Sequence, residues 1–266
     1  MLASLVVAFG TLAVLLADTI LTGWPELDRQ LFSDPPSTVA AEAGARPAIL
    51  ATLYLGLLVL LLSVPIGVLT AIYLEEYADR ERWWNRLIEV NIQNLAAVPS
   101  IVYGILGLAF IVRGIGLGRV VLAGALILTL VVLPTVVVAS REAIRAVPDS
   151  IRQGAFALGA TKWQVVRRQV LPAAIPGIAT GSILALSRAV GETAPLIMVG
   201  AIVYVAFDPT LLGAYTALPV QIYNWTRQPD PAFQTLAAAG AIVLLATVLS
   251  MNAVAIVLRN RYRKRW

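Results

Sequence analysis

The chain has 266 residues, of which 59% are hydrophobic and only 13% are charged, and its mean hydropathy is +0.83. Charged residues make up about a quarter of an ordinary soluble domain, so the composition excludes that class and indicates a polytopic membrane protein. The sequence has no Cys and no His. Disulfides and thiolate metal sites are therefore excluded, and a zinc enzyme or an intramembrane metalloprotease is a poor candidate.

Apolar runs long enough to cross a bilayer recur along the chain and predict six transmembrane helices in an all-α fold. We expect residues 1–266 to form one transmembrane domain, whose longest inside loop is 141–175. The first run is the weakest of the six, and a cleaved signal peptide is the alternative interpretation for it. The predicted spans are 1–17, 48–74, 94–112, 119–140, 176–206 and 233–258.

Basic residues are distributed unequally between the two sets of loops that these spans define. Fourteen lie in the segments on one side of the membrane and five lie in those on the other. By the positive-inside rule the richer side is cytoplasmic, so both termini are expected in the cytoplasm. The net charge of +5 is thus interpreted as a topology signal and not as a nucleic-acid surface. The richer set is Arg80, Arg82, Arg86, Arg141, Arg145, Arg152, Lys162, Arg167, Arg168, Arg259, Arg261, Arg263, Lys264 and Arg265, and the poorer set is Arg29, Arg46, Arg113, Arg119 and Arg227.

The segment GSILALSRAVGETAPLIMVGA, residues 181–201, places two charges inside a run otherwise apolar enough to span the membrane. A charge at the centre of such a helix costs roughly 2.5–3.5 kcal/mol on insertion scales, so Arg188 and Glu192 indicate a functional site. Their spacing of four puts them on one helix face, where they can pair. Pro195 predicts a bend or opening about one turn before it, near Gly191.

We interpret this segment as the lining of a pathway for a polar, anionic solute. The alternative is a clamp, in which the two charges pair only to hold helices together. The predicted pathway residues are Arg188, Glu192, Thr193, Pro195 and Ser187.

The segment 75–93 contains many charges together with Trp83 and Trp84, and it is expected to lie along the membrane interface. An aromatic anchor is the favoured interpretation, and contact with a partner is the alternative. Pro99 and the glycines after it predict an irregular third span. The glycine-rich sequence at 114–118 lacks the context of a phosphate-binding loop, so an external turn is expected there.

The loop 141–175 predicts two short helices that meet at a bend. Ser150 is a candidate N-cap for the first helix, and Gly159 is the natural residue to end it. Thr161, with the glutamine three residues later, predicts a capping box for the second helix, which Pro172 is expected to stop. We interpret this elbow as an element that docks into a groove on another protein. An amphipathic helix on the lipid surface is the alternative.

The same loop resembles the signature of ABC importer permeases, EAA-x3-G-x9-I-x-LP. The sequence QGAFALG from Gln153 and the LP at Leu171 and Pro172 match its spacing, while Gln153, Gly154 and Gln169 depart from its Glu, Ala and Ile. The stretches GAFALGATKWQVVRRQVLPAAIPGI, SRAVGETAPL and AVPSIVYGILG resemble phosphate-specific ABC transporter permeases of the PstA type. The coupling residues that the resemblance implies are Gln153, Gly154, Ala155, Gly159, Ala160, Thr161, Leu171 and Pro172.

The resemblance implies a type I ABC importer permease fold in the bacterial plasma (inner) membrane. It implies a subunit that carries inorganic phosphate inward, paired with a homologous PstC-type permease. Two cytoplasmic PstB-type ATPase subunits and an external PstS-type phosphate-binding protein are the other expected partners. The chain has no nucleotide-binding P-loop, so no cofactor or metal is expected on it, and ATP and Mg²⁺ are expected on the ATPase.

Rival interpretations remain at this stage. The nearest is a permease for sulfate, molybdate or a phosphonate, which the spans and the elbow do not separate from phosphate. A membrane-embedded enzyme would use Glu192 as a base with Thr193 or Ser187, although no His, Cys or second clustered intramembrane carboxylate supports it. A purely structural scaffold is the third.

Overall fold

The computed structural model of the chain describes residues 2–79, 81–201 and 204–261. In these ranges five helices are long and apolar enough to cross a membrane, and a bent pair of helices can form a sixth span. The expected all-α, multi-span architecture is therefore confirmed. The five helices are α1 (Leu2–Gly23), α3 (Arg46–Ile72), α6 (Val121–Arg145), α9 (Leu171–Gly191) and α12 (Ala232–Arg261), and the bent pair is α4 (Trp83–Ala97) and α5 (Ser100–Gly107).

Short helices and turns of π-helix connect these spans. The short helices are η1 (Trp24–Glu26), α2 (Arg29–Ser33), η2 (Ala40–Glu42), α7 (Asp149–Ala157), α8 (Lys162–Val165), α10 (Ala194–Val199) and α11 (Leu218–Thr226). The π turns are η3 (Tyr73–Tyr77), η4 (Leu108–Gly114) and η5 (Val166–Val170), which extend α3, α5 and α8 respectively.

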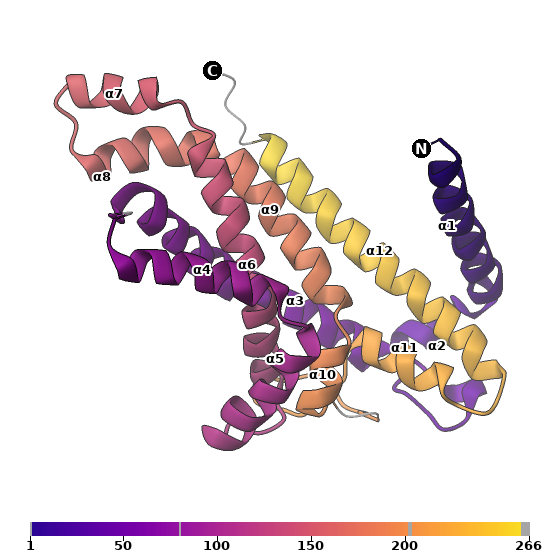
Figure 1. Cartoon of the computed structure of the whole chain (residues 1–266). Helices are drawn as coiled ribbons and strands as arrows, with labels where there is room; N and C mark the ends of the chain where they lie inside the picture. The colour runs from indigo at the N-terminus through magenta and orange to yellow at the C-terminus, as the bar shows by residue number, and fades with distance from the viewer. Residues whose placement is uncertain (1, 80, 202–203, 262–266) are drawn as a thin grey trace.

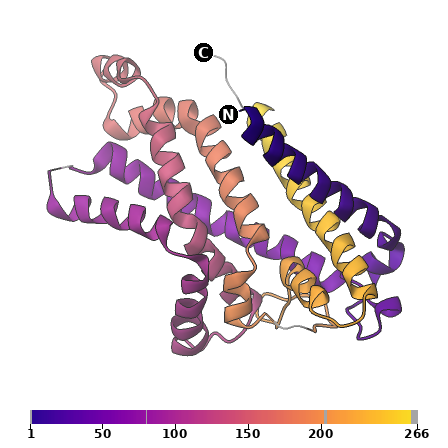
Figure 2. The ribbon, with the colours of Figure 1, turned by 45° about the vertical axis from the view of Figure 1, so that its right-hand side comes forward.

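Helix α6 lies at the centre of the bundle and packs against α3 and α9. In its apolar window 67% of the residues are buried, whereas none are buried in that of α1, which lies along α12 at the outside (Figures 1 and 2). Small residues allow α9 to approach α6 closely. A Cβ added at Gly177 would lie 2.7 Å from the Cβ of Ala143, and one added at Gly181 would overlap Ala139.

The molecule has two distinct ends (Figure 1). At the elbow end lie α7 and α8, together with the first turn of α1 and the last turn of α12 (Figures 1 and 2). At the opposite end, which we call the loop end, lie α2, α10 and α11. A separate apolar core underlies the elbow end, where Ile72, Ile144, Val166 and Val170 pack together.

Two predicted spans differ from the structure. The third, expected at 94–112, begins at Trp83 and bends by 104° between α4 and α5. Pro99 lacks an N–H, and it lies in the break. The fifth is expected to run to residue 206, but its helix α9 ends at Gly191 and is followed only by the short α10. Gly200, with φ of +91°, ends α10, because a left-handed residue cannot continue a right-handed helix.

Two predicted helix ends in the elbow are wrong. Ser150 is not the N-cap of α7, because the helix begins at Asp149 and Pro148 occupies the cap position. Pro172 does not stop the second elbow helix. A π turn at 166–170 leads from α8 straight into α9, and Pro172 lies in the first turn of α9, where a missing N–H is tolerated.

Candidate functional site

The predicted ion pair between Arg188 and Glu192 is present at the point where α9 ends. Arg188 Nε donates to Glu192 Oε1 at 3.2 Å. The Arg188 side chain is 53% exposed in the isolated chain, and that of Glu192 is 18% exposed. A guanidinium has five N–H donors, and this is the one polar contact of Arg188 among the described residues, so donors remain for an anion. The spacing of four predicted the pair correctly.

The chain opens where Pro195 predicted it. α9 ends at Gly191, Glu192 is extended, and Pro195 lies in the first turn of α10. Pro195 is buried against α5, since a Cβ added at Gly104 would lie 2.7 Å from its Cα. Irregular backbone at membrane depth is tolerated where it is buried in protein or lines a cavity.

Ser187 occupies a different place from the ion pair. Its hydroxyl donates to Ile183 O at 2.8 Å and lies 2.7 Å from Asn252 Oδ1 on α12. The structure therefore uses Ser187 to join α9 to α12. Thr193 lies in the break itself, at the N-cap position of α10.

The predicted elbow is present between α7 and α8. Gly159 has φ of +78°, as expected of a residue that ends a helix in the left-handed region. Thr161 and Gln164 form the predicted capping box. Three large apolar side chains surround this bend and are exposed: Phe156 by 47%, Leu158 by 90% and Trp163 by 53%. The elbow thus presents an apolar knob.

The residues of the signature fall on two different elements. Gln153 and Gly154 are exposed on α7, while Ala155 and Ala160 pack partly against the core of the elbow end. Leu171 and Pro172 start α9, beyond the elbow, and so do not form part of the knob.

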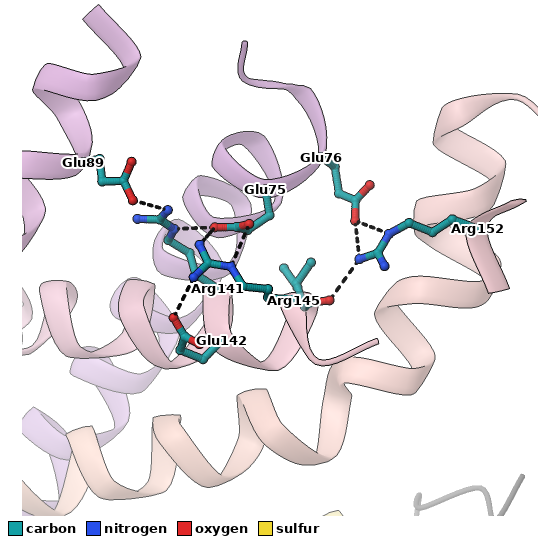
Figure 3. Close-up of polar contacts among 8 residues, drawn as sticks. Glu75, Glu76, Glu89, Arg141, Glu142, Arg145 and Arg152 are labelled. Carbon is teal, nitrogen blue, oxygen red and sulfur yellow. Dashed lines mark hydrogen bonds and ion pairs between the residues drawn. The ribbon is translucent and has the colours of Figure 1, made fainter. Parts of the chain in front are cut away.

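Sequence reasoning missed a set of ion pairs at the elbow end, the elbow charge cluster (Figure 3). Arg141 on α6 donates to Glu75 at 2.8 Å and to Glu89 on α4 at 2.6 Å. Arg152 on α7 donates to Glu76 at 2.9 Å and to two backbone carbonyls at the end of α6. The cluster comprises Glu75, Glu76, Glu89, Arg141, Glu142, Arg145 and Arg152.

A signal for this cluster was present in the sequence. Two adjacent carboxylates, Glu75 and Glu76, end one span, and two arginines spaced by four, Arg141 and Arg145, end another. The sequence therefore shows that opposite charges are available at these span ends, but not that the spans bring them together. The arginines had been interpreted only as topology signals.

The chain matches a known family over residues 63–264, described as "Binding-protein-dependent transport system inner membrane component". Among curated proteins it is 31% identical to the probable ABC transporter permease protein YqgI of Bacillus subtilis, over 88% of this chain and 83% of that protein. It is 32% identical to the phosphate transport system permease protein PstA of Xylella fastidiosa, over 90% of this chain and 83% of that protein.

Another relative, the phosphate transport system permease protein PstA 1 of Mycobacterium tuberculosis, is 37% identical. That match covers 74% of this chain and 64% of the relative, so the chain spans less than two thirds of its length.

Solved structures share the fold. A chain of the MetNI methionine ABC transporter, in inward-facing conformations, superposes with a TM-score of 0.63 at 19% identity, over 82% of this chain and 94% of that one. A chain of a bacterial ABC transporter that imports the acidic polysaccharide alginate gives the same TM-score and identity over 99% of both chains. The expected type I importer permease fold is thereby confirmed. With three quarters of its length inside the family match, this chain belongs to the inner membrane components of binding-protein-dependent transport systems, which are transporter subunits and not enzymes.

Proposed function

We propose that this chain is the permease subunit of an ATP-driven importer that moves inorganic phosphate across the bacterial plasma membrane. The observation that carries the proposal is the Arg188–Glu192 pair, a half-exposed guanidinium at a helix break, in a chain 32% to 37% identical to phosphate permeases. A multi-pass protein with both termini in the cytoplasm agrees with the distribution of basic residues.

Arg188 would recognise the substrate by charge and by geometry. Phosphate at neutral pH is a mixture of monoanion and dianion, and a planar guanidinium can offer it two parallel hydrogen bonds. Glu192 partly neutralises Arg188, so the anion is bound without being trapped. Passage further requires that the site opens alternately to each side, which the break between α9 and α10 would permit.

The elbow would couple this movement to ATP hydrolysis on another subunit. The exposed knob of Phe156, Leu158 and Trp163 suits a hydrophobic groove on an ATPase. We propose as partners a homologous PstC-type permease, two PstB-type ATPase subunits that bind ATP and Mg²⁺, and an external PstS-type phosphate-binding protein. In this assignment the chain itself binds no cofactor.

Reconstitution with the co-encoded subunits tests the proposal. Proteoliposomes that contain the complete importer should take up labelled phosphate only when ATP is supplied on the ATPase side. An excess of sulfate, molybdate or a phosphonate should compete weakly. If one of these anions is transported in preference to phosphate, the chain serves that oxyanion and the phosphate assignment is wrong.

A further inference from the structure

The elbow charge cluster joins α7 to the ends of α3 and α6, and joins α6 to α4, and its geometry indicates a role in the transport cycle (Figure 3). We propose that Arg152 and Arg141 are positioning residues for coupling. Arg152 transmits a displacement of the elbow to the end of α3. The Arg141–Glu89 ion pair acts as a joint: when it breaks, α4 is no longer held to α6. This inference rests on the proposed function, because it takes the elbow to be the element that an ATPase moves.

Arg152 joins α7 to two elements with a single guanidinium. Its Nε and Nη2 atoms donate to Glu76 Oε1 at 3.1 and 2.9 Å, at the end of α3. Its Nη1 and Nη2 atoms also donate to Val147 O at 2.6 Å and Ile144 O at 3.0 Å, where α6 ends. Only a planar group with several fixed donors can satisfy these acceptors together. Since the Arg152 and Glu76 side chains are only 16% and 9% exposed, solvent screens this ion pair little.

Arg141 has two partners in different environments. Its bond to Glu75 is buried, because the two side chains are 9% and 4% exposed. Its bond to Glu89 reaches a carboxylate that is 40% exposed. The first bond therefore fixes α6 to the end of α3. The second, which holds α4, is the weaker link, since solvent screens an exposed ion pair.

A polar cavity of about 180 Å³ lies beside this weaker link, and its lining includes Glu89, Arg141, Asn85 and Arg86. A water molecule occupies roughly 30 Å³ in the liquid, so several waters fit there. They would solvate Glu89 and Arg141 after separation, which lowers the cost of breaking the bond. The helix that Glu89 holds meets α5 at a 104° bend, across which the buried Tyr103 donates to Leu95 O at 2.8 Å, so a displacement of α4 would reach α5 through that contact.

Stability alone is a poor explanation for this arrangement. Apolar side chains of similar volume would hold the same elements together at least as well, because burying charges costs much of what their attraction gains. Ion pairs add a defined orientation and the ability to exchange partners. Those are the properties that a link between an elbow and a moving helix requires.

The ratio of phosphate taken up to ATP hydrolysed tests this inference in the reconstituted importer. Glu89→Gln removes the charge of the joint at a half-exposed site, and Arg152→Lys keeps the charge but loses the planar group. In both variants we expect the ATPase to stay bound and the ratio to fall about fivefold or more, the scale of a typical coupling interaction. Asp208→Asn is the matched control: it removes a carboxylate that is 53% exposed and pairs with Arg46 outside the elbow charge cluster, so its loss should leave the ratio normal.

A purely structural role predicts a different pattern, with less assembled complex but a normal ratio, and that result would overturn the inference. If Arg152→Lys fails to assemble, the ratio measured for Glu89→Gln decides between the coupling role and the structural role. Leu158→Asp separates this test from the proposed function. If Leu158→Asp still binds the ATPase, the elbow is not the element that docks on it. If Leu158→Asp loses the ATPase while Glu89→Gln and Arg152→Lys stay fully coupled, the elbow docks as proposed but Arg152 and the Arg141–Glu89 ion pair have no role in coupling.

Discussion

At the residue scale, the Arg188–Glu192 pair follows from a local rule that the sequence states directly. Two charges four residues apart on a helix face one another, and the structure joins them at 3.2 Å. The guanidinium is half-exposed in the isolated chain, so its remaining donors are available there to a substrate or to a residue of a partner permease. A pathway uses those donors for the anion and a clamp uses them for a helix, so variants of the pair separate the two interpretations.

The removal of the carboxylate alone gives a prediction at this scale. Glu192→Gln should lower the stability of the purified complex by about 1 kcal/mol or less, because solvent screens the uncompensated Arg188. Thermal unfolding in detergent measures this loss. Asp208→Asn is the matched control, since it breaks another half-exposed ion pair, with Arg46 at the loop end. A failure of Glu192→Gln to assemble, with Asp208→Asn normal, would support the clamp instead.

At the element scale, the elbow depends on one backbone conformation. Gly159 has φ of +78°, and no atom outside its immediate neighbours lies within 4 Å of an added Cβ. A larger residue would thus meet backbone strain but no clash, and the strain of the left-handed conformation is about 1–2 kcal/mol. The chain can relieve it only by changing the angle between α7 and α8.

Gly159→Val should therefore misplace the apolar knob while the transmembrane helices still insert. We expect weaker binding of the ATPase or hydrolysis that no longer responds to the loaded binding protein. Gly154→Ala is the control, because Gly154 lies within α7 with open space around it, and a methyl group there improves helix propensity. Normal uptake and normal stimulated hydrolysis in Gly159→Val would show that the elbow angle does not matter for coupling.

How far the sequence predicts the elements depends on the range of the interactions that set them. The capping box at Thr161, the turn at Gly159 and the break before Pro195 arise from neighbours in the sequence, and each was predicted. The exact ends of the helices were not predicted. Pro148 rather than Ser150 occupies the N-cap position of α7, and a π turn leads from α8 into α9, so the helix continues past Pro172.

The elbow charge cluster was not predicted, because its partners are far apart in the sequence. The bonds of Arg141 to Glu75 and Glu89 join residues 66 and 52 positions apart, and that of Arg152 to Glu76 joins residues 76 apart. A single sequence shows which charges are available but not which helices bring them together. The packing of α6 between its neighbours decides that.

At the scale of the whole molecule, the elbow end and the loop end differ in the elements they carry, and they are expected to face opposite sides of the membrane. The elbow end carries the charge cluster, the knob and the last turn of α12, and the loop end carries α2, α10 and α11 (Figure 1). If the bent α4–α5 pair is one span, the described residues hold six spans, and the first turn of α1 and the last turn of α12 then lie on one side, as they do in the structure. The excess of basic residues predicts that this side faces the cytoplasm.

Labelling of single cysteines tests this orientation without background, because the chain has no Cys. Ser37 lies between α2 and η2, Thr226 is the last residue of α11, and Ser150 lies in α7 of the elbow. An impermeant thiol reagent applied outside intact cells should label Ser37→Cys and Thr226→Cys. It should label Ser150→Cys only after the membrane is opened. External labelling at position 150 would reverse the orientation.

In the proposed function phosphate crosses the membrane in contact with Arg188, and uptake by a variant that lacks both charges of the pair measures whether it does. In the double variant Arg188→Gln with Glu192→Gln no charge is left unpaired, so the complex should assemble at normal abundance. Labelled phosphate uptake into proteoliposomes should nevertheless fall to the level of protein-free vesicles. The single variant Arg188→Lys should keep only part of the uptake of the unmodified complex, because an ammonium lacks the planar donors of a guanidinium. Substantial phosphate uptake by the charge-free pair at matched protein abundance would contradict the account, since neither residue would then be needed by the substrate.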